Sequence, residues 1–309
     1  MTPAVCVIIP AYNRRATVRE AIDSVLANRG VDFELIVVDD GSDDGTFEEL
    51  SPLAASGAFG LERTAHRGPA AARNRGAALA RAPLLAFLDS DDLWLPEKLA
   101  RHTAWMRAHP DCAISQTGEL WMRNGRRVNP ARHLRKRSGD IFIDSLRTCL
   151  ISPSAAMIRT DLFHALGGFD ETMAAAEDYD LWLRVLLGHE AGLLDEPLVI
   201  RRAGHPDQLS ATMPALDRFR ILALTKLLAL DCLNGERRSA AAETLAGKCR
   251  IYARGLSRRG REDDANWYES IAERATSEWG ARSSLGIACA ADAMRARLVR
   301  EPNREDACG

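Results

Sequence analysis

The sequence predicts an α/β fold in which a mostly parallel sheet is flanked by helices. Three apolar runs are predicted to be strands buried on both faces, at positions 5–9, 33–38 and 84–88. Three further stretches are predicted to be helices, at positions 17–26, 46–53 and 70–80. This succession of strands and helices is typical of a doubly wound, Rossmann-like sheet.

The rest of the chain is predicted to be a mixed segment followed by helices. Between residues 112 and 200 we expect strands at 113–118, 120–123 and 198–201, a basic loop at 125–139 and an amphipathic helix at 178–187. Later helices are expected at 220–230, 240–254 and 265–277, before a polar tail from about residue 300. We therefore expect one domain over 1–212 and an all-helical extension over 213–309.

The composition argues against several classes of protein. With 309 residues, of which 46% are hydrophobic, the chain is long enough to bury a large core. A net charge of −2 gives no general attraction to nucleic acid. The seven cysteines include no C-x-x-C pair, which argues against a disulfide framework or zinc site and favours a reducing compartment. Because no signal peptide or apolar stretch of about 18 residues occurs, we expect a cytoplasmic protein, at most peripheral to a membrane.

Polar residues follow each of the first predicted strands. The sequence P-A-Y-N occupies 10–13, D-D-G-S occupies 39–42, and D-S-D-D occupies 89–92. In doubly wound sheets, ligands bind beyond the carboxyl ends of the strands. We therefore expect these three clusters to converge on one edge of the sheet and to form the functional site.

The D-S-D-D cluster is the strongest of these signals. Three carboxylates in four residues repel one another unless water or a cation separates them. Hard divalent ions such as Mg²⁺ and Mn²⁺ take oxygen ligands and bind diphosphates at the same time. The alternative is a helix N-cap, which explains Asp92 but not Asp89 and Asp91. We interpret Asp92 as that structural cap.

The acidic run at 39–46 has two readings. It is either a capped acidic turn or a carboxylate site that accepts hydrogen bonds from a nucleobase or a ribose. No G-x-G-x-x-G motif follows the first predicted strand, which argues against a dinucleotide site.

These residues resemble the signature of family 2 glycosyltransferases. The six matching motifs are V-I-I-P-A-Y-N at 7–13, V-V-D-D-G-S at 37–42, A-R-N-R-G at 72–76, F-L-D-S-D-D at 87–92, G-G-F-D-E at 167–171 and E-D-Y-D-L-W-L-R at 177–184. Their order and spacing match over roughly residues 4–212. The resemblance implies the GT-A fold, with a nucleotide-binding half over about 1–110 and an acceptor half over about 111–212. It also implies an inverting, metal-assisted transfer of a sugar from a nucleotide diphosphate to an acceptor hydroxyl.

The resemblance implies a role for residues of the nucleotide-binding half. Asp40 matches the nucleobase-binding aspartate, and Arg73 matches a basic residue near the nucleotide, with a surface helix arginine as the alternative. Asp89 and Asp91 match the D-x-D pair, of which the first faces the ribose and the second ligates Mn²⁺ or Mg²⁺. Further contacts to the nucleotide sugar are expected from Pro10, Ala11, Tyr12, Ser90 and Glu177.

Asp178 matches the catalytic base of the family. An acceptor hydroxyl must lose its proton as it attacks the anomeric carbon, and a carboxylate within hydrogen-bond reach can take that proton. The alternative is that Glu177 and Asp178 are acids favoured at a helix N-terminus. Trp182 lies one turn later on the same helix face and either stacks on a sugar or packs in the core.

The loop around His205 is expected to reach the metal and the phosphates. Some GT-A enzymes place a histidine ligand at this point, so His205 is expected as a second metal ligand, with a structural histidine as the alternative. Gln208 and Ser210 are expected near the phosphates. The expected donor is a UDP-sugar, and the acceptor is a glycan, a lipid-linked molecule or another hydroxyl compound.

Two segments outside the motifs suggest partners. The stretch 123–137 holds seven cationic residues and no acids, and is read as a solvated loop or as a surface for an anionic acceptor. The apolar stripe at 220–230 is expected to pack on the first domain or on a second subunit in a homodimer. The basic, amphipathic stretch 284–300 is a candidate for peripheral membrane contact.

Two other functions remain as alternatives. Nucleotidyltransferases share a similar sheet and paired aspartates, but they carry a glycine-rich basic loop where this chain has P-A-Y-N-R-R at 10–15. A non-catalytic protein that binds sugar nucleotides or glycans is expected to have lost a carboxylate, whereas Asp40, Asp89, Asp91 and Asp178 are all present.

Overall fold

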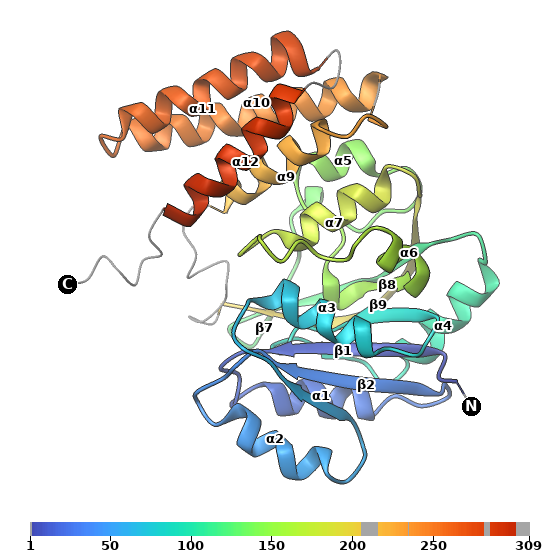
Figure 1. The fold of residues 1–309 in the computed structure, drawn as a ribbon. Helices are drawn as coiled ribbons and strands as arrows, with labels where there is room; N and C mark the ends of the chain where they lie inside the picture. Colours follow the sequence, from blue (N-terminus) through green and yellow to red (C-terminus); the bar gives the residue numbers. More distant parts are fainter. Residues whose placement is uncertain (1, 205–215, 234, 281–284, 301–309) are drawn as a thin grey trace.

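A nine-stranded sheet forms the centre of the computed structural model, which describes residues 2–204, 216–233, 235–280 and 285–300. The strands are β1 (Val5–Ala11), β2 (Phe33–Asp39), β3 (Gly60–Arg63), β4 (Leu84–Phe87), β5 (Leu93–Trp94), β6 (Ile114–Arg123), β7 (Arg126–Val128), β8 (Ala156–Arg159) and β9 (Ala191–Ala203). Their order is β3-β2-β1-β4-β8-β6-β9-β5, with β7 paired to β6. Figure 1 shows β1 and β2 side by side in the part of the chain coloured blue.

The predicted parallel sheet is confirmed in its first half and is mixed in its second. Strands β3, β2, β1 and β4 are parallel neighbours. Strand β8 then runs antiparallel to both β4 and β6, while β6 and β9 are parallel. Strand β8 therefore runs opposite to its two neighbours, and β6 and β9 return to the direction of β4, while β5 pairs antiparallel with β9.

Helices cover both faces of this sheet. The described helices are α1 (Val18–Leu26), α2 (Thr46–Ala54), α3 (Pro69–Leu79), α4 (Lys98–Ala108), α5 (Phe142–Arg147), α6 (Thr160–Ala165), α7 (Glu177–Leu186), α9 (Asp217–Leu228), α10 (Gly235–Ser257), α11 (Glu262–Arg274) and α12 (Leu285–Arg300). Alternate residues of β1 point to opposite faces. Val7 joins a core with α1, α2 and α4, whereas Ile8 joins the core that contains α3 and α7.

Helix α3 lies unusually close to β1. A Cβ atom on Gly76 would stand 2.5 Å from the Cγ2 atom of Ile8, so only glycine allows the helix to pack at this depth. The result is that Arg73 and Asn74, which precede Gly76 on α3, are held directly against the strand ends.

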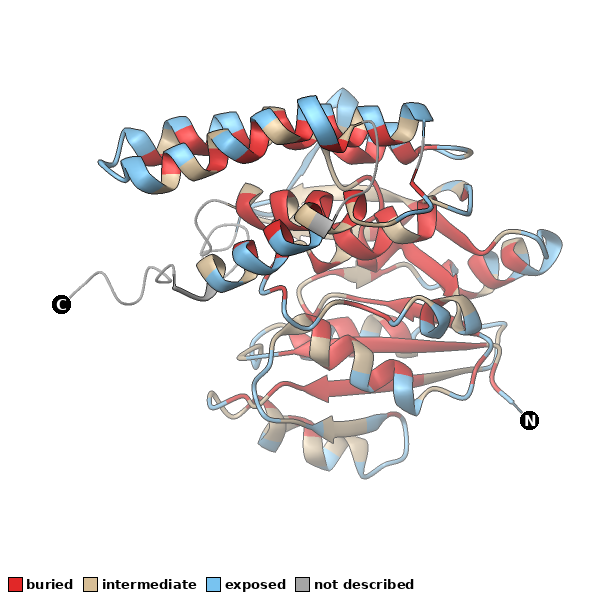
Figure 2. Ribbon diagram, turned by 45° about the horizontal axis from the view of Figure 1, so that its top comes forward, coloured by how far each residue is buried: buried red, intermediate tan, exposed pale blue. Residues whose placement is uncertain are grey.

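The C-terminal helices share a core with the sheet. One continuous cluster of buried side chains runs from Ile8 and Phe87 through α7 to Leu224 and Trp279. Figure 2 shows this buried band crossing from the sheet into the helical layer. The predicted boundary near residue 212 lies outside the described residues. Within the described chain, no helix is long and apolar enough to span a membrane.

Candidate functional site

The polar clusters at the first strand ends come together as predicted. Strand β1 lies between β2 and β4, with Ile8 in register with Ile36 and Phe87. The turn after β2 is tied to β1 because the Asp40 amide donates to the carbonyl of Ala11 at 2.8 Å. The Asn13 amide in turn donates to Ser42 Oγ at 2.9 Å.

Asp40 is buried, and its carboxylate holds the loop that follows β3. One carboxylate oxygen accepts the Arg67 amide at 2.9 Å and the other accepts the Gly68 amide at 2.8 Å. The second oxygen also lies 2.9 Å from Nδ1 of His66. The predicted contact of Asp40 with a nucleobase is not tested by these bonds, but they give the carboxylate a structural task that the sequence did not suggest.

An aromatic platform stands beside Asp40. The ring of Tyr12 stacks on the ring of His66, with centroids 3.8 Å apart and planes 19° apart. Tyr12 is 40% exposed, whereas Pro10 and Ala11 belong to β1 and are buried. Of these three predicted contacts, only Tyr12 has an exposed side chain. His66 was missed because no apolar run marks the short strand before it.

Arg73 joins the two halves of the site. Its side chain is 6% exposed, and it forms ion pairs with Asp89 at 2.7 Å and with Glu177 at 2.5 Å. Its guanidinium also lies 5.4 Å from the centre of the Phe169 ring. Burial raises the pKa of Glu177, and the positive charge of Arg73 opposes that rise. Arg73 is therefore a buried bridge and not the surface arginine that was the alternative reading.

The prediction that Asp92 caps a helix is wrong. The residues after it form β5, and the next helix, α4, begins at Lys98. Asp92 is buried instead, and its carboxylate accepts bonds from Ser154 Oγ at 2.7 Å and from the Arg202 amide at 2.9 Å. Asp92 thus fastens the D-x-D turn to the 3₁₀ turn Pro153–Ala155 and to β9. The structural role was predicted, but not its form.

The crowded carboxylates suit a divalent cation. Burial, together with the negative charges of Asp89 and Asp91, raises the pKa of Asp92 well above its usual range. Within the described residues, no three side chains of His, Cys, Asp or Glu form a preformed metal site. Magnesium, however, is commonly held by one or two carboxylates and by the phosphates of its substrate. Half-buried Asp91 fits this pattern.

Four other predicted contacts remain. His205, Gln208 and Ser210 lie outside the described residues, and Ser90 is buried.

Asp178 lies in the first turn of α7, beside Glu177. The residue before the helix, Ala176, has a φ of 58°, so the chain turns sharply into α7. The half-buried carboxylate of Asp178 accepts its neighbour's amide, that of Tyr179, at 2.7 Å. The other carboxylate oxygen accepts the Cys149 thiol at 3.5 Å. Burial and the charge of Asp178 raise the pKa of Cys149, so this thiol stays protonated.

Trp182 packs in the core. It is 2% exposed, and its ring meets that of Phe169 edge-on at a centroid distance of 6.0 Å. Of the two readings of Trp182, core packing is the one observed, and its ring offers no surface to a sugar. Trp182 therefore supports the ring of Phe169, on which the guanidinium of Arg73 lies.

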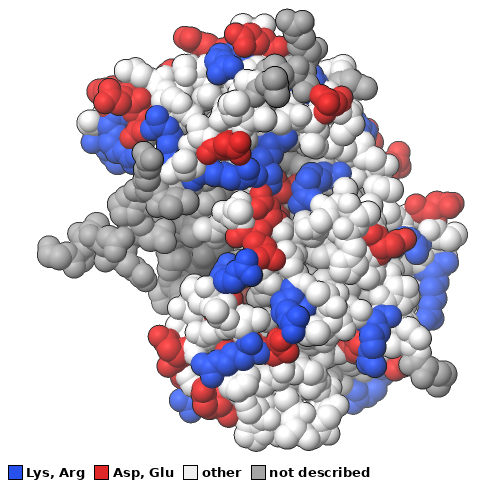
Figure 3. Space-filling model, viewed as in Figure 1, with Lys and Arg blue, Asp and Glu red and all other residues white. Residues whose placement is uncertain are grey.

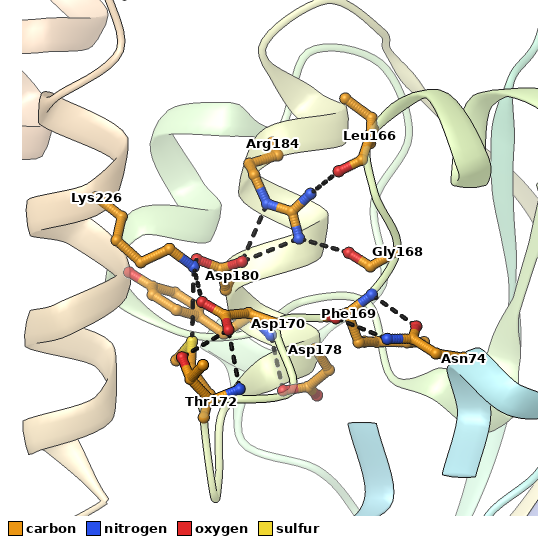
Figure 4. A network of polar contacts seen from close by, with 12 residues as sticks. Asn74, Leu166, Gly168, Phe169, Asp170, Thr172, Asp178, Asp180, Arg184 and Lys226 are labelled. Carbon is orange, nitrogen blue, oxygen red and sulfur yellow. Dashed lines mark hydrogen bonds and ion pairs between the residues drawn. The ribbon is translucent and has the colours of Figure 1, made fainter. Parts of the chain in front are cut away.

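The loop that leads into α7 is braced from two sides, as Figure 4 shows. Asn74 on α3 makes a pair of bonds with the backbone of Phe169, at 2.8 Å and 2.9 Å. A Cβ atom on the preceding Gly168 would stand 2.6 Å from Asn74 Oδ1, which explains the glycine. On the other side, Lys226 of α9 donates to Asp170 at 2.6 Å and to Asp180 at 2.5 Å. Sequence reasoning missed both Asn74 and Lys226.

A protein-family comparison matches the part of the chain that builds this site. The model described as "Glycosyl transferase family 2" covers residues 6–167, which is more than half of the chain. An uncharacterised glycosyltransferase of Rickettsia felis is 32% identical over 194 residues, which make up 63% of this chain and 32% of that protein. The chain spans about a third of the length of the first curated relatives that it matches.

Solved structures with the same fold include two that hold nucleotide sugars. S. aureus TarS in complex with UDP-GlcNAc superposes with a TM-score of 0.60 at 19% identity, covering 88% of this chain and 91% of that one. The mannosyltransferase PcManGT from Pyrobaculum calidifontis, in complex with GDP-Man and Mn²⁺, gives 0.54 at 20% identity, covering 99% and 83%. At these identities the likeness establishes the fold alone.

The order of the motifs, their convergence at the strand ends and the family match are mutually consistent. The solved neighbours share this fold over most of the chain. The chain therefore has the GT-A fold and belongs to glycosyl transferase family 2.

Proposed function

We propose that the protein transfers a sugar from a nucleotide diphosphate to an acceptor hydroxyl with inversion at the anomeric carbon. The observation that carries this proposal is the Arg73 bridge between Asp89 and Glu177. It sets the D-x-D turn and the first turn of α7 on opposite sides of one guanidinium. A donor at the D-x-D turn and an acceptor at Asp178 would then face each other across the site.

The platform of Tyr12 and His66 supports a nucleotide in the donor site. A base stacks favourably on such rings, and the adjoining turn after β2 is rich in carboxylates and hydroxyls. TarS binds UDP-GlcNAc and PcManGT binds GDP-Man, so neighbours of the same fold take nucleoside diphosphate sugars. We propose a UDP-sugar as the donor.

Asp178 is proposed as the general base. Its carboxylate is half-buried at the helix N-terminus, where the helix dipole favours a negative charge. A base of this kind accelerates the reaction by about 10²-fold to 10⁴-fold.

Asp91 is proposed as the metal ligand. It would hold Mn²⁺ or Mg²⁺, which when bound offsets the charge that develops on the leaving diphosphate.

Two substitutions test these roles. Asp178→Asn keeps the shape of the side chain but removes the base, so kcat is expected to fall by at least about 100-fold. Binding of UDP with Mn²⁺, measured by calorimetry, is expected to stay unchanged. Asp91→Ala is expected to abolish the metal-dependent part of UDP binding.

The outcomes separate the proposal from its alternatives. If metal-dependent binding of UDP is unaltered in Asp91→Ala, the assignment of Asp91 as the metal ligand is wrong. Release of pyrophosphate instead of UDP would identify a nucleotidyltransferase. Binding without turnover across a broad panel of donors and acceptors would identify a binding protein.

A further inference from the structure

A cluster of exposed arginines lies on the hairpin that β6 forms with β7. Strands β6 and β7 form a hairpin that continues into the 3₁₀ turn Arg132–Leu134. Along it, five arginines have exposed side chains, namely Arg123, Arg126, Arg127, Arg132 and Arg135. No carboxylate of the described residues forms an ion pair with them. We call residues 123–135 the basic hairpin.

Both ends of the basic hairpin are fixed by a buried ion pair. Glu119 and Lys136 lie 3.0 Å apart, with side chains only 3% and 11% exposed. Glu119 also accepts the indole N–H of Trp121 at 2.8 Å, and Lys136 donates to the carbonyl of Leu150 at 3.1 Å. Leu150 follows Cys149, whose thiol donates to Asp178. The base of the basic hairpin is therefore fixed close to Asp178.

Arg201 extends this positive charge into the site. It lies opposite Trp121 in the β6–β9 register, and its guanidinium sits 4.8 Å from the centre of that ring. Its nearest carboxylate within the described residues is Glu119 at 3.9 Å, and its side chain is 41% exposed. The charges of Glu119, Asp92, Asp89 and Asp178 all act on it. Arg201 is thus stacked on an aromatic ring, and its partly exposed guanidinium has only one long ion pair among the described residues.

We propose that Arg201 and the basic hairpin bind a phosphate group of the acceptor. Guanidinium groups pair with phosphate oxygens through two parallel hydrogen bonds, and stacking on Trp121 fixes the orientation of one of them. The anchoring of the hairpin beside Asp178, on the acceptor half, distinguishes this phosphate from that of the donor. The inference rests on the proposed function, since it names the class of acceptor for that site.

The test fills the donor site first. Wild-type protein saturated with UDP and Mn²⁺ is titrated with glucose 1-phosphate and, as the uncharged match, with methyl glucoside. A second arm measures sedimentation with phosphatidylcholine vesicles that contain or lack phosphatidic acid. We expect the phosphate-bearing probe to bind more tightly in at least one arm, and less tightly as salt is raised. Binding only to vesicles assigns the phosphate to a lipid-held acceptor, and binding only to glucose 1-phosphate assigns it to a soluble one.

Variants locate the binding. Arg201→Gln and the triple variant Arg126→Gln, Arg127→Gln, Arg132→Gln are each expected to weaken binding of that probe at least about tenfold. The matched control replaces Arg254, Arg258 and Arg259, three exposed arginines near the end of α10, with glutamine and is expected to change nothing.

Each other result overturns a specific claim. Equal binding of charged and uncharged probes by the wild type, or equal losses in the control, refutes the phosphate site. Weaker UDP binding in Arg201→Gln would assign Arg201 to the donor. A wild type that binds no nucleotide at all would instead refute the proposed function.

Discussion

Among single residues, Arg73 is one whose substitution we expect to lower the stability of the protein strongly. It is buried between two carboxylates, one of which, Glu177, is itself only 6% exposed. Removing one partner of a buried pair leaves an uncompensated charge, which is far costlier than losing an exposed pair. The neighbouring Arg75 offers that comparison, since its side chain and that of its partner Glu62 are 45% and 33% exposed.

The two arginines give a matched experiment on one helix. We expect Arg73→Met to lower the free energy of unfolding by about 3–5 kcal/mol, because Glu177 is left buried and unpaired. Arg75→Met is expected to cost less than about 1 kcal/mol. Urea unfolding followed by circular dichroism measures both. Equal losses would show that Arg73 acts as an ordinary surface pair.

Residue types at strand ends were enough to select Asp40, Asp89 and Asp91 as candidates, and the family resemblance selected Asp178, but neither described their partners. Chain spacing places a carboxylate after a strand, whereas the contact of Asp40 with the loop at 64–68 depends on how that loop folds back. His66 and Asn74 therefore gave no signal beyond their polarity. Arg201 gave none either, because its meaning comes from Trp121 on a neighbouring strand.

Among the elements, α7 is held by the C-terminal helices as well as by the sheet. Lys226 of α9 bonds both Asp170, in the loop before α7, and Asp180, within it. Asp180 also pairs with Arg184 one turn later. Because Asp178 lies between these anchors in the chain, the position of the proposed base depends on a helix outside the family match.

Acidic and basic side chains are interspersed on the face of the molecule drawn in Figure 3.

Lys226→Met tests this anchor. We expect the free energy of unfolding to fall by about 2 kcal/mol at neutral pH, because Asp170 and Asp180 each lose a charged hydrogen bond. We also expect kcat to fall while UDP binding is unchanged, because α7 loses a support. Lys248→Met is the control, since Lys248 pairs with Asp217 inside the helical extension.

The stability loss in Lys226→Met should depend on pH. Although burial opposes it, the hydrogen bonds from Lys226 and Thr172 lower the pKa of Asp170 below its usual range. A carboxyl group whose pKa is lowered by folding stabilises the protein above its unfolded pKa, and this contribution is lost as the pH falls through the folded value. The difference between wild type and variant is therefore expected to be full at neutral pH and to shrink below about pH 4. A difference that grows in acid would contradict the assignment.

Elements marked by apolar runs were predicted well, and those shaped by their neighbours were not. Strands β1, β2 and β4 and helix α7 fall within a residue or two of their predicted bounds. Strand β6 was predicted as two strands, but it is one strand whose register with β9 shifts around Gly118, where a Cβ atom would stand 2.9 Å from the Glu196 carbonyl oxygen. Only 198–201 of the longer β9 was expected, since its other residues are largely charged or small.

Across the whole molecule, the helical extension behaves as part of the core. Buried side chains of α9 such as Leu224 belong to the same cluster as Ile8. A chain that ends at Gly204 would expose the buried face of α7, and we expect it to aggregate or to lack a cooperative thermal transition. Scanning calorimetry and sedimentation check this. A truncated chain that unfolds cooperatively at the wild-type temperature would instead show that 213–309 is an independent domain.

The bridge made by Arg73, with the paired bonds of Asn74, also limits how this enzyme can be recombined. A designer who wishes to change the acceptor would exchange the second half of the chain for that of another family member. Two hydrogen bonds of Asn74 end on the backbone of Phe169 and a third ends on Glu171, and one of the ion pairs of Arg73 ends on Glu177. A chimera joined near residue 110 should therefore be functional only if the incoming half supplies a carboxylate and a loop that match these two side chains.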